Sequence, residues 1–233
     1  GGDALLVVGN GLLANKFRSS NLPVDTIVIA SGVSNSSELR QSEFDREKEL
    51  VLSYAEVGKV LIYFSSCSVE LSEKMWTPYI RHKYEMESLI ISNKLGLVYR
   101  LPNVVGFGGN DKTMFNFFCS AIRNEKEIFV RKNAKRSLID VDDVVTLVEY
   151  LVTSNMSRKE LSYDLMRVVL PTQYSVIEII NVIQAHYGKK AITSMGEMDF
   201  LDVAKSSVVV DCIEKQVIKF DHTYLSRLVQ KYA

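Results

Sequence analysis

Short, continuous runs of apolar residues alternate with helical patterns through the first hundred residues of the chain. These runs occupy residues 4–9, 25–32, 59–66 and 95–102. They have the length and composition of strands that are buried on both faces of a sheet. Residues 43–57 show the apolar stripe of a helix, and Thr77 and Pro78 are typical of the N-cap and first residue of another. Strands that alternate with helices predict a parallel α/β sheet with helices on both faces.

The pattern becomes more mixed beyond residue 105. We expect helices over residues 113–124, 141–154 and 175–188, and strands over residues 127–132, 162–170 and 203–211. Asp142 and Asp143 open the second of these helices, where acidic residues favour the helix dipole, so a structural role is the better interpretation for both. No linker separates the two halves. The sequence therefore predicts a core of residues 1–105 and a C-terminal α/β lobe of residues 106–233, mainly for substrate binding, packed on it.

Composition and charge narrow the class of protein. The 233 residues carry 28 basic and 28 acidic side chains, and this zero net charge argues against a nucleic-acid partner. No apolar run reaches the roughly 20 residues that span a bilayer, so we expect no membrane contact. The start lacks the features of a secretory leader. Three dispersed cysteines (Cys67, Cys119 and Cys212) and three scattered histidines (His82, His186 and His222) indicate neither disulfides nor a metal site. We therefore expect a cytoplasmic protein.

A glycine-rich turn follows the first predicted strand. Residues 9–14, GNGLLA, fit the pattern G-x-G-x-x-A between a strand and a helix. Gly9 would allow a sharp turn, Gly11 a close approach to a pyrophosphate, and Ala14 tight packing of the helix on the strand. The alternative is an ordinary tight turn without a ligand. The second strand ends in Ala30-Ser31-Gly32, without the acidic residue that usually binds the adenosine ribose of a dinucleotide.

Three side chains with catalytic potential follow the third predicted strand. Ser66 ends this strand, at the edge where ligands of open parallel sheets bind. Tyr79 begins the next helix, and Lys83 lies one turn later on the same face. An ammonium and a helix N-terminus both favour phenolate, and such a tyrosine can exchange a proton with a hydroxyl or ketone. Alone, the same residues also fit a solvated Tyr–Lys face after a serine-rich turn.

The order of these motifs resembles the extended short-chain dehydrogenase/reductases, the superfamily of nucleotide-sugar epimerases, dehydratases and ketoreductases. The resemblance covers roughly residues 4–185 and rests on GNGLLA, VDTIVIASGVSNS, VLIYFSSCSV, PYIRHK, RLPNVVGFGG and RSLIDVDDVV. It implies a Rossmann-like fold that binds NAD or NADP. DTIVIASG resembles the fourth strand of the family. The usual second and third strands would then be missing, which accounts for the short chain and the absent ribose acid.

The resemblance also implies roles for individual residues. Catalysis would use Ser66, Tyr79 and Lys83, with Tyr79 as the general acid/base. The cofactor would contact Gly9, Asn10, Gly11, Leu12, Leu13, Ala30, Ser31, Gly32, Ser65, Lys83 and Pro102. The substrate would contact Ser66, Asn103, Asn116 and Arg136, with Arg131 a weaker candidate. Arg136 also fits a solvated cation beside Lys135.

The activity implied is NAD(P)-dependent oxidoreduction of a nucleotide-linked sugar, and reduction of a 4-keto sugar is the favoured reaction. Family dehydratases carry an Asp-Glu pair directly after the catalytic hydroxyl residue. Cys67 and Ser68 occupy these two positions here, which argues against dehydration. A small packed thiol is a better interpretation of Cys67 than a nucleophile.

The alternatives to a 4-keto reductase are a 4-epimerase with tightly held NAD and a non-catalytic nucleotide-sugar or dinucleotide-binding module. Cell-surface polysaccharide synthesis is the implied pathway. Homodimers formed through paired helices are common in the family, so the helix from Tyr79 is a candidate dimer surface.

Overall fold

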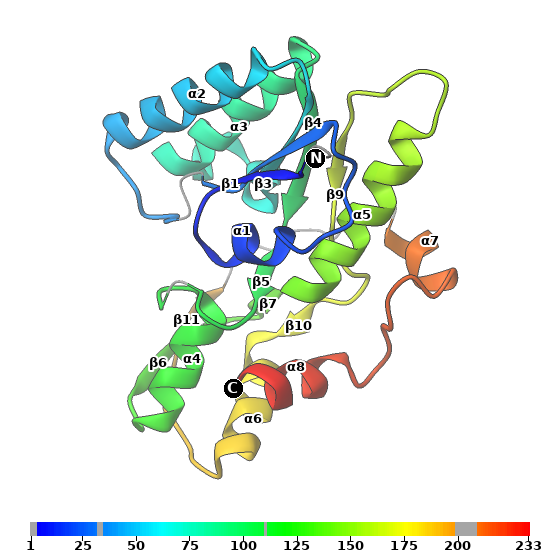
Figure 1. Ribbon diagram of the computed structural model, residues 1–233. Coiled ribbons are helices and arrows are strands. Elements are labelled where there is room, and N and C mark those ends of the chain that lie inside the picture. Colours follow the sequence, from blue (N-terminus) through cyan, green and yellow to red (C-terminus); the bar gives the residue numbers. More distant parts are fainter. Residues whose placement is uncertain (1–3, 32–34, 110, 199–208) are drawn as a thin grey trace. The chain divides into compact units, whose positions relative to one another are not determined.

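The chain folds into two compact units. The computed structural model describes residues 4–31, 35–109, 111–198 and 209–233 (Figure 1). The first unit comprises residues 1–102 and 141–168, and the second comprises residues 103–140 and 169–233. The core predicted from the sequence ends near residue 105, and residues 141–168 fall in the predicted lobe. In the structure, this later segment belongs to the first unit.

A five-stranded parallel sheet forms the centre of the first unit. Its strand order is β1-β2-β3-β4-β9, and every neighbouring pair is parallel. The strands are β1 (Leu6–Val8), β2 (Thr26–Ile29), β3 (Val60–Ser66), β4 (Gly96–Leu101) and β9 (Leu165–Arg167). The four residues of β2 are all buried, as the continuous apolar run predicts. The predicted fold class, a shortened Rossmann-like sheet, is confirmed.

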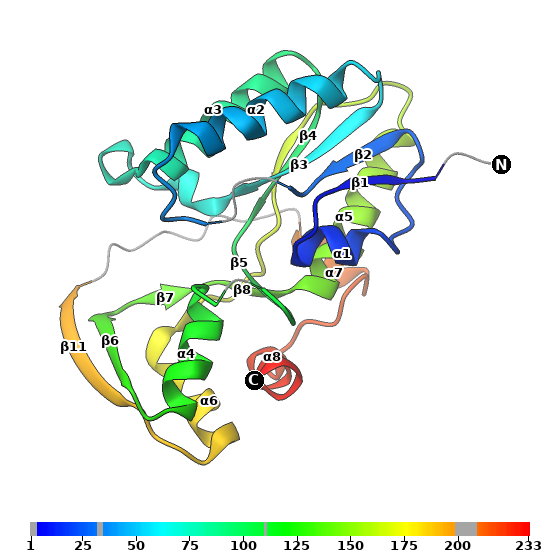
Figure 2. The ribbon, with the colours of Figure 1, turned by 60° about the vertical axis from the view of Figure 1, so that its left-hand side comes forward.

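Helices cover both faces of this sheet (Figure 2). Helices α2 (Gln41–Ala55) and α3 (Pro78–Ser92) lie on one face, and α1 (Leu12–Phe17) and α5 (Val141–Met156) lie together on the other. Two short 3₁₀ helices, η1 (Cys67–Glu70) and η2 (Glu73–Met75), lead from β3 into α3. Thr77 caps α3 as predicted, because its side chain accepts a hydrogen bond from the backbone N–H of Ile80 at 3.3 Å.

The face under α2 and α3 contains a continuous hydrophobic core. Its fully packed members come from the two helices and from alternate positions of the strands: Ile27, Ile29, Val51, Leu61, Tyr63, Met86, Ile90 and Val98. Burial of this apolar surface is the main force that holds the helices on the sheet. The same core also encloses polar side chains, which bear on the candidate site.

In its described residues, the second unit combines three small two-stranded sheets with helices. The paired strands are β5 (Asn103–Val105) with β8 (Leu138–Asp140), β6 (Glu127–Lys132) with β11 (Ile192–Met198), and β7 (Lys135–Arg136) with β10 (Tyr174–Ser175). The helices are α4 (Met114–Arg123), α6 (Val176–Tyr187), α7 (Val209–Glu214) and α8 (Tyr224–Tyr232). Helix α6 packs against both α4 and α8. It ends as predicted at Gly188, which adopts a left-handed conformation.

One strand prediction needs correction. The strand expected over residues 203–211 lies largely outside the described residues, and its last part, from Val209, begins helix α7 instead. Valine is favoured in strands, but tertiary context overrides this weak local preference. None of the helices among the described residues is both long and apolar enough to span a membrane.

Candidate active site

The carboxyl ends of four neighbouring strands bring the predicted cofactor residues to one edge of the sheet. Gly9 follows β1, Ala30 and Ser31 follow β2, Ser65 and Ser66 end β3, and Pro102 follows β4. Because the strands are parallel and in register, these ends lie side by side. Open parallel sheets bind ligands at this edge. Gly32 lies outside the described residues.

The glycine turn is shaped by the close approach of β2. Gly9 has φ +129°, and a Cβ placed on it would lie 2.5 Å from the carbonyl oxygen of Ala30. Gly11, in contrast, has φ −84°, and a Cβ there would meet nothing within 4 Å. Ala14, on α1, is fully buried. The turn therefore needs Gly9 for its own packing, whereas Gly11 leaves open space above the backbone.

An arginine that was not predicted from the sequence stabilises this turn through hydrogen bonds. Arg18, at the end of α1, donates hydrogen bonds to the carbonyl of Gly9 and to Oδ1 of Asn15. Asn15 in turn donates to the carbonyl of Asn10 at 3.3 Å. Helical spacing places the side chains of Asn15 and Arg18 within reach of the turn, but spacing alone does not identify the carbonyl groups that they contact.

Alanine substitutions at the two glycines should separate folding from ligand binding. Gly9→Ala should lower the free energy of unfolding by about 1–3 kcal/mol through backbone strain. Gly11→Ala should change it by less than about 1 kcal/mol. If a pyrophosphate binds in the open space at Gly11, this second variant should lose about tenfold or more in dinucleotide affinity, equivalent to about 1.4 kcal/mol. Urea denaturation and a dinucleotide titration test the pair, and equal stability of both variants would contradict the geometry.

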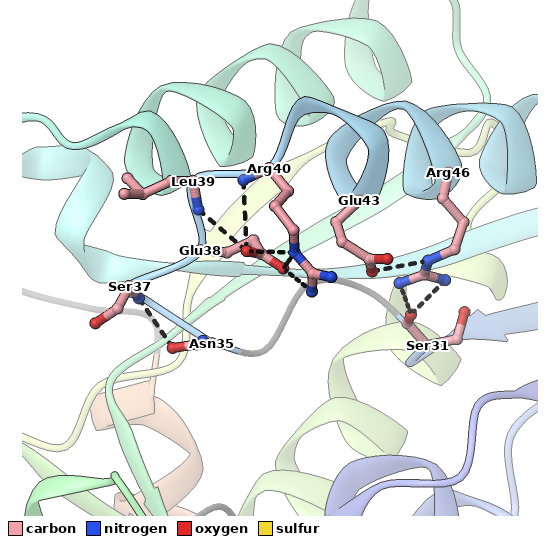
Figure 3. Close-up of polar contacts among 8 residues, drawn as sticks. All are labelled: Ser31, Asn35, Ser37, Glu38, Leu39, Arg40, Glu43 and Arg46. Atoms are coloured by element: carbon pink, nitrogen blue, oxygen red, sulfur yellow. Dashed lines mark hydrogen bonds and ion pairs between the residues drawn. The ribbon is translucent and has the colours of Figure 1, made fainter.

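The end of β2 is held by an arginine from the following helix (Figure 3). Both terminal nitrogens of Arg46, on α2, donate to the carbonyl of Ser31 at 3.3 Å, and its Nε contacts Glu43 at 3.1 Å. The sequence showed no clear basic residue at this strand end. Arg46 was missed because it lies in the next element along the chain, and only the fold brings it back to Ser31.

Ser66 ends β3 and caps the 3₁₀ helix that follows. Its Oγ accepts a hydrogen bond from the backbone N–H of Ser68 at 3.1 Å and lies 2.7 Å from Oγ of Ser68. Helix η1 packs against α3, which carries Tyr79 and Lys83. Ser68, which was not among the predicted site residues, thus orients the Ser66 hydroxyl, and the half-buried Cys67 lies between them in the chain.

Tyr79 and Lys83 meet on one face of α3. The Nζ of Lys83 lies 5.9 Å from the centre of the Tyr79 ring. Tyr79 is half-buried, whereas Lys83 is 4% exposed. The Lys83 ammonium donates to Oη of Tyr63 at 3.0 Å and to the carbonyl of Phe64 at 3.4 Å, both on β3. The lysine therefore spans the space between α3 and the end of β3.

A buried acid lies behind Lys83. Oε1 of Glu47, on α2, accepts a hydrogen bond from the hydroxyl of Tyr63 and lies 3.2 Å from Nε2 of His82 and 3.6 Å from Nζ of Lys83. Glu47 is completely buried. The sequence does contain a trace of this group, because Glu47 occupies the stripe of α2 whose other members, Phe44 and Val51, are core residues.

A second ionic network anchors η1 and α3 to the sheet. Arg100 on β4 makes two contacts with Glu87 of α3, at 2.9 and 2.7 Å, and this hydrogen bonding raises the pKa of Arg100. Arg167 lies directly opposite Arg100 on β9. Glu70 of η1 contacts Arg167 at 2.6 Å and Arg100 at 3.4 Å, so its charge offsets the repulsion between the two arginines.

Apart from Ser66, which ends β3 in the first unit, the predicted substrate residues belong to the second unit. Asn103 begins β5, where its Nδ2 donates to the carbonyl of Ser137 at 3.1 Å. Asn116 lies half-buried on α4, and Arg136 on β7 donates to the carbonyl of Lys135 at 2.7 Å. Arg131 is exposed on β6. Asp142, for which a structural role was predicted, lies on α5 in the first unit and pairs with Lys16 at 3.2 Å.

The edge of the sheet has features that fit a dinucleotide. The Oγ atoms of Ser31 and Ser65 are buried at the ends of β2 and β3 and have no hydrogen-bond partner within the described residues. Buried hydroxyls normally find a partner, so such atoms at a ligand edge suit a polar ligand. The open backbone at Gly11 adds room for phosphate groups. In the described part of the chain, no three His, Cys, Asp or Glu side chains cluster as metal ligands would.

Fold and site geometry together define an α/β protein of the Rossmann-like class with a Ser-Tyr-Lys set at the ligand edge of the sheet. No protein-family model matches the sequence, and no curated protein does. Solved structures, however, share the fold over nearly the whole chain.

One similar structure is RMD from Pseudomonas aeruginosa complexed with NADPH, with a TM-score of 0.76, 15% identity, and coverage of 98% of this chain and 97% of that one. MoeE5 in complex with UDP-glucuronic acid and NAD has a TM-score of 0.72 and 18% identity, covering 99% and 97% of the two chains. The UDP-N-acetylglucosamine 4-epimerase from Bacillus cereus has a TM-score of 0.68 and 17% identity, covering 97% and 95%. At these identities the similarity establishes the fold.

Proposed function

We propose that the chain is an NAD(P)-dependent oxidoreductase that acts on a nucleotide-linked sugar, and that it reduces a 4-keto sugar. The observation that carries the proposal is the Tyr79–Lys83 pair next to β3, whose end bears Ser66 at the ligand edge of the sheet. Support comes from the similar structures, which include complexes with NADPH, with NAD and with UDP-glucuronic acid. The nucleotide sugar is the proposed partner, and Asn103, Asn116 and Arg136 are its proposed contacts.

Each catalytic side chain has a distinct task in this reaction. Bound NAD(P)H supplies the hydride for the carbonyl carbon of the sugar. The Tyr79 hydroxyl donates its proton to the carbonyl oxygen as general acid, and the hydroxyl of Ser66 donates a hydrogen bond to the same oxygen. The Lys83 ammonium, whose Nζ lies 5.9 Å from the centre of the Tyr79 ring, favours the phenolate that remains on Tyr79, because opposite charges attract.

The first test is a titration of the purified protein with NADH and NADPH. Trp76, the single tryptophan of the chain, precedes Tyr79 by three positions, so it is a suitable energy-transfer donor for the nicotinamide. We expect binding with a Kd between about 1 µM and 1 mM, followed by oxidation of the cofactor when 4-keto nucleotide sugars are added.

Other outcomes of the same experiment lead elsewhere. NAD that survives purification, together with interconversion of two 4-hydroxy sugars, would replace the reductase with the 4-epimerase. Binding of neither dinucleotide by folded, nucleotide-free protein would overturn the oxidoreductase proposal. The protein would then be tested as a nucleotide-sugar-binding module.

A further inference from the structure

Among the described residues of the first unit, the most deeply buried charged side chain lies next to the proposed catalytic lysine. Glu47 is 0% exposed and Lys83 is 4% exposed, and both lie among core residues under α2 and α3. Taking a carboxylate and an ammonium out of water is costly unless each has partners. Here the two charges lie 3.6 Å apart, and the hydroxyl of Tyr63 contacts both groups.

Tyr63 fixes the direction of the hydrogen bonds in this group. Burial, and then the nearby Glu47 carboxylate, raises the pKa of Tyr63 well above its usual value, so the side chain is a neutral phenol. Its single O–H donates to Glu47, and its oxygen accepts an N–H from Lys83. Because a neutral phenol has a single O–H, Tyr63 can donate only to the Glu47 carboxylate and must accept from the Lys83 ammonium.

The same bonds determine where the Lys83 ammonium points. An ammonium has three N–H donors in a roughly tetrahedral arrangement. Two of them are directed at β3, one to Oη of Tyr63 at 3.0 Å and one to the carbonyl of Phe64 at 3.4 Å. The tetrahedral geometry then fixes the direction of the third N–H bond. Nζ itself is held 5.9 Å from the centre of the Tyr79 ring.

We propose that Glu47 and Tyr63 are positioning residues for Lys83, and that they hold its ammonium at the end of β3 beside Tyr79. Neither residue needs to touch the substrate or the cofactor. A well-packed apolar pair would join α2 to β3 at a lower desolvation cost, so attachment of the helix alone does not account for these groups. The consequence for catalysis rests on the proposed function, whereas the placement of Lys83 does not.

The placement is tested with Glu47→Gln and Tyr63→Phe, each close in volume to the original residue. The amide oxygen introduced by Glu47→Gln still accepts the Tyr63 hydroxyl but carries no charge, whereas Tyr63→Phe removes the bridge. Brief treatment with acetic anhydride and mass spectrometry then measures the acetylation rate of Lys83. We expect both variants to raise this rate about fivefold or more, because a buried lysine reacts only when it is released.

Matched variants separate release of one side chain from loosening of the unit. Glu49→Gln removes an exposed acid of the same helix, and Tyr84→Phe changes an exposed tyrosine of α3, so both should leave Lys83 labelling unchanged. Amide hydrogen exchange along α3 should also stay at the wild-type rate in Glu47→Gln. A wild-type labelling rate in both test variants, or faster exchange throughout α3, would overturn the proposal.

The kinetic consequence is a separate measurement. Once a 4-keto substrate is known, Glu47→Gln should lower kcat about tenfold or more and leave KM for the sugar within about twofold, as expected for an interaction needed in the transition state. If the wild-type protein binds no dinucleotide, the proposed function fails, and the labelling result still decides whether Glu47 and Tyr63 hold Lys83. Faster labelling with unchanged kcat would overturn the catalytic consequence alone.

Discussion

Tyr79→Phe should abolish turnover while leaving ligand binding intact. The substitution removes the hydroxyl that protonates the carbonyl oxygen and keeps the ring beside Lys83, so we expect kcat to fall about 10²- to 10⁴-fold. The affinities for the dinucleotide and the nucleotide sugar should stay within about threefold, because the lost group acts on the reacting atoms. Initial rates with a 4-keto nucleotide sugar, together with binding titrations, provide the measurement.

Tyr84→Phe is the matched control for this prediction. Tyr84 lies on the same helix, is 44% exposed and packs beside Trp76, so the change should leave kcat at the wild-type value. Full turnover by Tyr79→Phe would rule out the proposed mechanism. Activity absent from the wild-type chain, with binding retained, would instead support the non-catalytic module.

Arg100→Met should cause a large loss of stability. The change removes the partner of Glu87, whose side chain is 3% exposed, and leaves that carboxylate charged in the interior. Breaking a buried pair from one side costs about 3–5 kcal/mol. In a chain of this length, such a loss lowers Tm by about 10 °C. Thermal unfolding followed by circular dichroism gives the shift directly.

An ion pair whose arginine is exposed provides the control. Arg40 contacts Glu38 at 2.7 and 3.2 Å (Figure 3), and the Arg40 side chain is 70% exposed. Because water solvates Arg40 in the folded chain, and the backbone N–H groups of Leu39 and Arg40 still donate to Glu38 when the guanidinium is lost, Arg40→Met should leave Tm nearly unchanged. Equal losses in the two variants would mean that burial does not determine the contribution of these pairs.

The strands at the centre of the sheet were predictable from the sequence, for a clear physical reason. A strand covered on both faces must be apolar throughout, and the runs at 25–32, 59–66 and 95–102 correspond to β2, β3 and β4. The ends of α3 and α6 were also predictable, since Thr77 and Gly188 satisfy local backbone requirements.

Pairings between distant segments were not predictable in the same way. Strand β9 has only three residues and pairs with β4. No local sequence pattern specifies this pairing or its register. Among the candidate site residues, the sequence placed Ser66, Tyr79 and Lys83 at the right elements. It did not identify Glu47 or Tyr63 as partners of Lys83, because helical and strand periodicity indicates burial and leaves the contacts of a buried side chain open.

The two outer strands of the large sheet have a consequence for self-association. The edge strands β1 and β9 have three residues each, whereas β3 and β4 between them have seven and six. Unpaired N–H and C=O groups on an edge strand can recruit a strand from another molecule and start aggregation, and short edge strands limit this hazard. The shortened sheet thus ends on both sides in strands that offer another copy of the chain little backbone to extend.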